Sequence, residues 1–158
     1  MIGNSRIDGF AIRRACPEDE AAIRHCAETA FARYVPRMGR RPAPMDVDFE
    51  RHIGAGEVHA ALDLEQALLG YVILIARPDH LLLDSLAVLP EAKGMGLGKA
   101  LLAFCEDETR RQGFDEIRLY TNARMTENLT LYPHFGYVET DRRRDEGFDR
   151  VFFRKKLG

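Results

Sequence analysis

A glycine-rich run with a lysine at each end, residues 93–99 (KGMGLGK), is the part of the chain best suited to bind a ligand. It follows an apolar segment typical of a buried strand and precedes a segment with the apolar spacing of a helix. Glycine lets the backbone adopt positive φ and approach a ligand closely, and a helix N-terminus adds about half a positive charge. The run therefore predicts a site for a phosphate or pyrophosphate group.

Two common glycine motifs do not fit this run. A dinucleotide-binding fingerprint, GxGxxG, counted from Gly94 puts Lys99 at the third glycine. A P-loop needs four residues before its Gly-Lys-Ser/Thr, whereas three residues separate Gly94 from Gly98 and Ala100 follows the lysine. Nucleoside triphosphate chemistry thus loses its main support, and a tight turn without a ligand is the simpler alternative.

A second candidate region is residues 34–45, which begin with Tyr34 and contain Arg37, Arg40 and Arg41 but no acidic residue. Three prolines and a glycine break any long helix, so we expect an irregular segment here. If the segment faces a cleft, its cations would repel a purely cationic ligand and would hold a carboxylate or phosphate. A solvated loop is the alternative, because arginines are usually exposed.

Other side chains that could do chemistry are scattered. Asp84 shares strand parity with Leu86 and would be a costly buried carboxylate without a partner. Glu57 and His59, which alternate on a neighbouring predicted strand, are two further side chains that could act as a base. The five histidines show no metal-ligand spacing, and Cys105 is typical of a core position, so no metal site is predicted.

Composition limits the class of protein. The chain has 158 residues, of which 46% are hydrophobic and 30% charged, with a formal net charge of −2. This is typical of a soluble globular chain and gives no support to nucleic-acid binding by overall charge. The run 142–144 (RRR) is diluted by acidic neighbours. Three scattered cysteines and no apolar leader or bilayer-length segment predict a cytoplasmic protein without a membrane span.

Hydrophobic periodicity predicts an α+β chain. The expected elements are a strand at 10–14, a helix at about 18–33, a short helix at 46–53, strands at 57–62, 68–76 and 80–89, a long helix ending near 112, a strand at 116–121, a short helix at 126–134, and strands starting at 137 and 148. The strand at 80–89 is apolar nearly throughout, so we expect it to be buried on both faces. Strand, turn, long helix and strand then make a right-handed parallel crossover.

In this order the segments resemble the GNAT N-acetyltransferase superfamily. Residues 86–90 (LAVLP) and 93–98 (KGMGLG) match its strand ending Leu-Ala-Val-x-Pro and its Arg/Gln-x-x-Gly-x-Gly/Ala motif, with Lys93 in place of Arg or Gln. The resemblance extends over nearly the whole chain through three further segments, IRRACPEDEAAI, LLGYVIL and LYPHFGYVET.

The resemblance implies a single GNAT-like domain over residues 1–158. Its fold is α+β, with a central mixed, mostly antiparallel sheet of about six or seven strands. A parallel central pair is splayed, and helices flank the sheet. The co-substrate implied is acetyl-CoA, with no metal, bound by residues Leu86, Ala87, Val88, Lys93, Gly94, Met95, Gly96, Leu97, Gly98, Lys99 and Asn128.

The resemblance also implies a mechanism, in which a primary amine attacks acetyl-CoA directly in a ternary complex. The Leu86 N–H would polarise the acetyl carbonyl, and Tyr132 would act as general acid toward the CoA sulfur. Asp84 is the candidate general base, with a water chain as the alternative. Relatives more often place the asparagine seven residues before the tyrosine, where this chain has Met125.

We expect a small amine or a protein amine as acceptor, with a preference for amino-acid-like amines bound by Tyr34, Arg37, Arg40 and Arg41. A homodimer formed through a sheet edge is compatible with the pattern. Nucleic-acid and membrane partners are not expected. The alternative from another class is a catalytically silent acyl-CoA-binding or sensing module, which would need no Tyr132.

Overall fold

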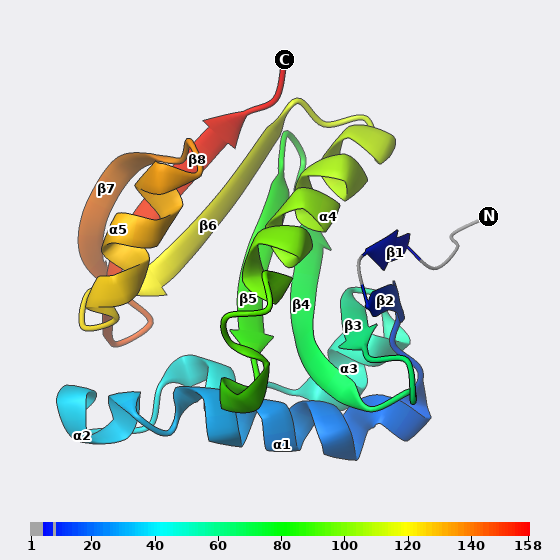
Figure 1. The fold of residues 1–158 in the computed structure, drawn as a ribbon. Coiled ribbons are helices and arrows are strands. Elements are labelled where there is room, and N and C mark those ends of the chain that lie inside the picture. Colours follow the sequence, from blue (N-terminus) through cyan, green and yellow to red (C-terminus); the bar gives the residue numbers. More distant parts are fainter. Residues whose placement is uncertain (1–4, 8) are drawn as a thin grey trace.

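The computed structural model describes residues 5–7 and 9–158, which form one mixed sheet with helices on both of its faces (Figure 1). The strands are β1 (Ser5–Ile7), β2 (Phe10–Arg14), β3 (Val58–Leu62), β4 (Leu68–Ala76), β5 (Leu81–Val88), β6 (Glu116–Asn122), β7 (Val138–Asp145) and β8 (Phe148–Lys156). The helices are α1 (Glu20–Phe31), α2 (Tyr34–Met38), α3 (Phe49–Gly54), α4 (Leu97–Arg111) and α5 (Thr126–His134), with short 3₁₀ turns η1 (Pro17–Asp19), η2 (Ala43–Asp46) and η3 (Pro90–Ala92).

The sheet confirms the predicted fold class. Its strand order is β1-β2-β3-β4-β5-β6-β8-β7, and its neighbours are antiparallel except for β5 and β6. Helix α4 connects that parallel pair, as the crossover prediction requires. The described sheet has eight strands rather than six or seven, because the short strand β1 pairs with β2 at one edge.

The parallel pair separates along its length. Strands β5 and β6 are paired only from Leu81↔Ile117 to Leu83↔Leu119, although β5 continues to Val88 and β6 to Asn122. Figure 1 shows the two strands close together at one end and diverging toward α1 and α2. The register between β4 and β5 also shifts here, which leaves Asp84 as an extra residue on β5. The divergence opens the sheet at its centre.

Two hydrophobic layers hold the helices on the sheet. Helix α4 buries Leu101 and Cys105 on one face, and helix α1 buries Ile23 and Cys26 on the other. A large apolar side chain buried in this way stabilises the fold by about 1.5–3 kcal/mol. The core position predicted for Cys105 is correct.

The prediction that β5 is buried on both faces is wrong. Its residues alternate between buried and half-buried, and Asp84, Leu86 and Val88 are among the half-buried ones. The half of β5 beyond Leu83 has no strand beside it on the β6 side, so its backbone edge is unpaired there and its residues border a cleft.

The segment after α1 is also more ordered than predicted. Residues 34–45 form the short helix α2 and enter η2, rather than an irregular loop. Pro36 fits because it lies in the first turn of α2, where a missing N–H costs little. Gly39 ends the helix with a left-handed φ of 73°.

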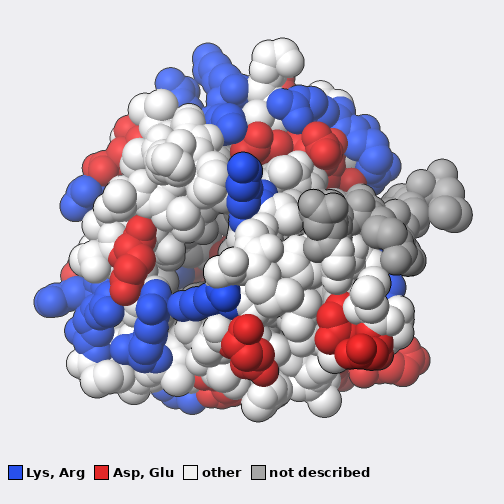
Figure 2. Space-filling view, in the orientation of Figure 1, with Lys and Arg blue, Asp and Glu red and all other residues white. Residues whose placement is uncertain are grey.

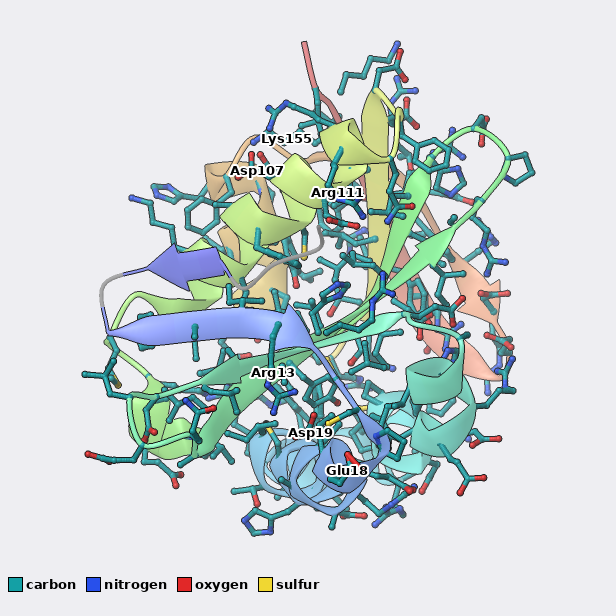
Figure 3. The ribbon with its side chains drawn as sticks, turned by 90° about the vertical axis from the view of Figure 1, so that its right-hand side faces the viewer. Arg13, Glu18, Asp19, Asp107, Arg111 and Lys155 are labelled. Carbon is teal, nitrogen blue, oxygen red and sulfur yellow. The ribbon has the colours of Figure 1, made fainter. Side chains whose placement is uncertain are left out.

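The start of α1 shows how a local contact shifts a helix boundary. The helix begins at Glu20 rather than near Glu18 because the preceding turn is 3₁₀. The Asp19 carboxylate accepts hydrogen bonds from the Cys16 N–H at 2.8 Å and from Arg13 Nη1 at 2.7 Å, so it ties β2 to this turn (Figure 3). The Arg13 hydrogen bond lowers the pKa of Asp19 to about 2.

Within the described residues, no helix has both the length and the apolar composition that crossing a lipid bilayer requires. No group of three or more His, Cys, Asp or Glu placed to hold a metal ion occurs in that part of the chain.

Candidate active site

Two cavities meet where β5 and β6 separate. The larger has a volume of about 500 Å³ and lies over the turn before α4. The smaller, about 50 Å³, lies between β5, β6, α2 and η2. Both are lined by Phe31, Leu86 and Asn128. Ligands in the two cavities would therefore approach each other beside Leu86.

The larger cavity is built on backbone. Gly94 and Gly96 have φ of 85° and 80°, and Gly96 is the N-cap of α4, with no side-chain cap on that helix end. A Cβ built at Gly94, Gly96 or Gly98 would meet no atom within 4 Å. Packing does not require these glycines, so the open space above them is available to a ligand. This geometry fits the pyrophosphate of acetyl-CoA.

Most of the predicted CoA-binding residues line this cavity, but not all. Those brought together are Leu86, Ala87, Val88, Lys93, Gly94, Gly96, Leu97, Gly98 and Asn128. Met95 and Lys99 do not line it, and the Met95 side chain is 53% exposed. Partial burial and the nearby Arg33 cation lower the pKa of Lys93.

Basic side chains gather beside this cavity. Figure 2 shows Lys and Arg clustered over α2 and the start of α5, at the lower left, next to a hollow between α5 and α4. Arg33 and Lys93 are the basic residues that line the larger cavity. Glu127 lines the same cavity and pairs with Arg33 at 3.4 Å, so an anionic ligand would meet the Lys93 cation and a partly neutralised Arg33.

Tyr132 lies on α5 and lines the smaller cavity. It is 7% exposed, and its ring packs edge-on against Tyr137 with the centroids 5.8 Å apart. Burial raises the pKa of the Tyr132 phenol, which keeps it protonated at neutral pH. Its position and protonation state suit a proton donor.

Asn128 lies one turn before Tyr132 and lines both cavities. Its Nδ2 donates a hydrogen bond to Thr121 Oγ1 on β6 at 3.0 Å. Met125, at the position where relatives more often have asparagine, is buried, and its sulfur accepts from Thr121 Oγ1 at 3.6 Å. Of these two residues, only Asn128 brings an amide to the junction of the cavities.

Of the three candidate bases, only Asp84 lines the smaller cavity. Its Oδ1 accepts a hydrogen bond from the Tyr120 hydroxyl at 2.6 Å. Glu57 is instead bonded to His52 Nδ1 at 2.7 Å. His59 packs against Phe104 of α4, and burial lowers its pKa to about 4. The structure thus separates Glu57 and His59 from the site.

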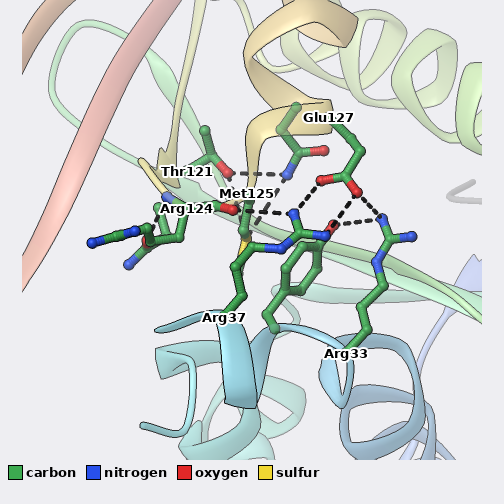
Figure 4. Close-up of polar contacts among 9 residues, drawn as sticks. Arg33, Arg37, Thr121, Arg124, Met125 and Glu127 are labelled. Atoms are coloured by element: carbon green, nitrogen blue, oxygen red, sulfur yellow. Dashed lines mark hydrogen bonds and ion pairs between the residues drawn. The ribbon is translucent and has the colours of Figure 1, made fainter. Parts of the chain in front are cut away.

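Arg37 forms a bridge between α2 and α5 (Figure 4). Its Nη1 and Nη2 donate to the two Glu127 carboxylate oxygens at 2.8 and 3.3 Å, and Arg33 approaches the same carboxylate at 3.4 Å. Both guanidinium groups lie over the Tyr34 ring, 5.1 and 4.8 Å from its centroid. The Arg37 hydrogen bond lowers the pKa of Glu127 to about 2.

Of the four residues predicted to bind the acceptor, Arg37, Arg40 and Arg41 line neither cavity, and Tyr34 lines the larger cavity rather than the smaller one. Arg41 pairs with Glu28 at 2.6 Å and with Asp46 at 3.0 Å. Arg40 donates to the Gly147 carbonyl at 2.9 Å and lies 3.9 Å from the centroid of the Phe148 ring. Both arginines line a separate hollow beside the smaller cavity. The predicted row of unpaired cations facing the cleft is therefore not found, because carboxylates from other elements neutralise Arg37 and Arg41.

Sequence reasoning missed several polar or aromatic residues that line the smaller cavity, among them Ser85, Tyr120, Phe148 and Arg150. They belong to no motif. The strand alternation of β6 and β8 does place Tyr120 and Arg150 on defined faces, but nothing local shows that the two strands border a cleft.

Comparisons with known proteins agree with this geometry. The profile described as the acetyltransferase (GNAT) family matches residues 21–137. No curated protein matches the chain significantly. Among solved structures, the PaiA N-acetyltransferase of Thermoplasma acidophilum, in complex with coenzyme A, is 19% identical, with a TM-score of 0.76, and the alignment covers 94% of this chain and 99% of that one.

Two further solved structures share the fold. The ribosomal-protein-S18-alanine N-acetyltransferase of Escherichia coli is 20% identical with a TM-score of 0.76, and the alignment covers 94% of each chain. A GNAT-family acetyltransferase of Listeria monocytogenes is 20% identical with a TM-score of 0.74, over 98% of this chain and 100% of that one. With the family profile covering most of the chain and the glycine turn placed at the mouth of a cavity, the protein belongs to the GNAT family of N-acetyltransferases, which use acetyl-CoA.

Proposed function

We propose that this protein transfers the acetyl group of acetyl-CoA to the primary amine of a small, amino-acid-like acceptor by direct attack in a ternary complex. The observation that carries this proposal is the meeting of the two cavities at Leu86. The larger suits a long anionic co-substrate, and the smaller suits a compact acceptor. Holding both reactants in one site replaces a bimolecular encounter by a step within the complex.

Acetyl-CoA supplies the thioester: the amine lone pair forms the new C–N bond, the C–S bond breaks, and the sulfur leaves with the electron pair. The backbone of Gly94 to Gly98 and the Lys93 side chain would hold the pyrophosphate. The unpaired edge of β5 beyond Leu83 would hydrogen-bond the pantetheine arm, and the Leu86 N–H would polarise the acetyl carbonyl.

Two protons must move, and this chain has a group for each. Asp84, with one carboxylate oxygen on Tyr120, would accept the proton that the amine loses. Tyr132, kept protonated by burial, would give a proton to the departing sulfur. An acyl-CoA-sensing module would need neither group beside its ligand, so their presence in the smaller cavity favours an enzyme.

The test is an acceptor panel with acetyl-CoA, covering small amines, amino acids and short peptides, read by thiol release and by the mass of the product. We expect stoichiometric release of CoA and acetylated amine. If acetyl-CoA binds and no amine in the panel is acetylated, the protein is a binding module and the proposal fails.

A further inference from the structure

We propose that Arg150 is the specificity-determining residue of the acceptor site and that it binds a carboxylate carried close to the reacting amine. The substrate class would then be free α-amino acids or amines with a carboxylate at similar separation. This inference rests on the proposed function, because it assigns the occupant of the same smaller cavity.

The smaller cavity has one charged residue of each sign among its lining, Asp84 and Arg150. Tyr120 lies between them. Its hydroxyl donates to Asp84 at 2.6 Å, and the Arg150 guanidinium lies 4.2 Å from the centroid of its ring. A carboxylate and a guanidinium thus both contact a single tyrosine, an arrangement that favours a compact zwitterion over a long diamine.

Arg150 is held in place with donors to spare. The residue is 5% exposed, and its Nη1 donates to Asp145 at 3.0 Å and to Glu146 at 2.8 Å. Its Nε and Nη2 donate no hydrogen bond to the described residues. A guanidinium presents its N–H groups as a rigid fork that matches a carboxylate, and two of the three nitrogens of this fork remain free to bind one. The fork therefore favours an anionic group on the ligand.

The Asp145 and Glu146 carboxylates both bind Nη1 of Arg150, whereas the carboxylates that engage Arg37 and Arg41 bind both Nη atoms of those guanidinium groups. Neither Asp145 nor Glu146 lines the smaller cavity, although both line a neighbouring hollow that Asp84, Tyr120 and Arg150 also border. The Ser85 hydroxyl, buried and without a hydrogen-bond partner, does line the cavity.

The remaining lining sets the size of the acceptor. A volume of about 50 Å³ leaves little room between Asp84 and Arg150, so the amine and the carboxylate must be close together. Met38, Pro42 and Phe148 form an apolar wall beside them. A short apolar side chain on the acceptor would pack there.

The experiment compares each free amino acid with its carboxamide, a pair that differs in the carboxylate alone. Binding to the CoA-saturated protein is measured by calorimetry, and kcat/KM by thiol release. We expect the best free acid to bind at least about 10-fold more tightly than its amide, as loss of a charge-assisted hydrogen bond predicts. In Arg150→Gln this preference should disappear while the affinity for the amide stays within about 2-fold.

Two variants separate recognition from folding. Glu146→Gln weakens the contact that holds Arg150 but leaves the guanidinium, so it should keep the preference for the acid. Arg150→Lys keeps the positive charge but lacks the planar fork, so its preference for the acid should lie between those of Arg150→Gln and the wild-type protein. The inference is overturned if wild-type protein binds acid and amide equally, or if Arg150→Gln loses affinity for both alike. If the protein binds the acid selectively but transfers no acetyl group, the role of Arg150 stands and the proposed function fails.

Discussion

The two sides of the site are built differently. The side that faces the glycine turn presents backbone, and no neighbouring atom lies within 4 Å of a Cβ at Gly94, Gly96 or Gly98. The side formed by residues 34–45 presents side chains, and its arginines are already engaged: Arg37 with Glu127, Arg41 with Glu28 and Asp46. A backbone site is a local property, whereas the charge that a side chain offers depends on partners from elsewhere in the fold.

The largest expected effect is on the backbone side. Gly96→Glu puts an anionic side chain at a φ of 80°, in the open space where the pyrophosphate would lie, so acetyl-CoA affinity should fall by about 100-fold or more. Gly113→Glu is the matched control: φ there is 88°, the space is equally open, and the residue lies past the other end of α4. If calorimetry finds equal CoA affinity in the two folded variants, the glycine turn does not bind the pyrophosphate.

Where the two sides meet, Tyr132→Phe removes only a hydroxyl. Turnover should fall by about 100-fold with acetyl-CoA affinity nearly constant, because the departing sulfur loses its proton donor. Tyr137→Phe is the control, since that hydroxyl bonds Glu106 at 3.0 Å and does not line either cavity. Steady-state rates that drop equally in both variants would reduce Tyr132 to a packing residue.

The bridge from Arg37 to Glu127 should matter less. Glu127→Gln weakens the contact between α2 and the helix that carries Asn128 and Tyr132, and we expect kcat/KM to fall several-fold. The folded-state pKa of Glu127, about 2, lies below its ordinary value, so the bridge is complete above about pH 5 and is lost only as pH falls toward 2.

The ratio of kcat/KM between Glu127→Gln and the wild-type protein should therefore be the same at every pH from 5 to 9. Glu28→Gln, which breaks the outer Arg41 pair instead, serves as the reference and should leave the rate unchanged. A Glu127→Gln defect that grows or vanishes within that pH range would show that the bridge itself titrates, contrary to this account.

The smallest effect is expected for Arg41→Ala. Its ion pairs are exposed, so the free energy of unfolding should hardly change, and the KM of the acceptor should change less than about 2-fold. Denaturant titration and initial rates measure both quantities. A 10-fold rise in the acceptor KM would return the arginines of residues 34–45 to the binding site.

The same contrast explains what the sequence could predict. Local patterns located the glycine turn, the crossover through α4 and the position of Tyr132, because each depends on residues adjacent in the chain. They did not locate the Arg37–Glu127 bridge or the Tyr120–Asp84 hydrogen bond, which join residues 90 and 36 positions apart. The register shift at Asp84, which helps to turn β5 toward the cleft, also depends on pairing with another strand.

The central claim is that acetyl-CoA and the amine occupy one site together and react without an acetyl-enzyme. None of the cysteines in the described residues lines either cavity, and burial raises the pKa of Cys26 to about 12 and that of Cys105 further, so neither is a ready nucleophile. Initial rates measured while both substrates are varied test the claim directly. We expect double-reciprocal lines that intersect; parallel lines, with CoA released before any amine is added, would contradict it.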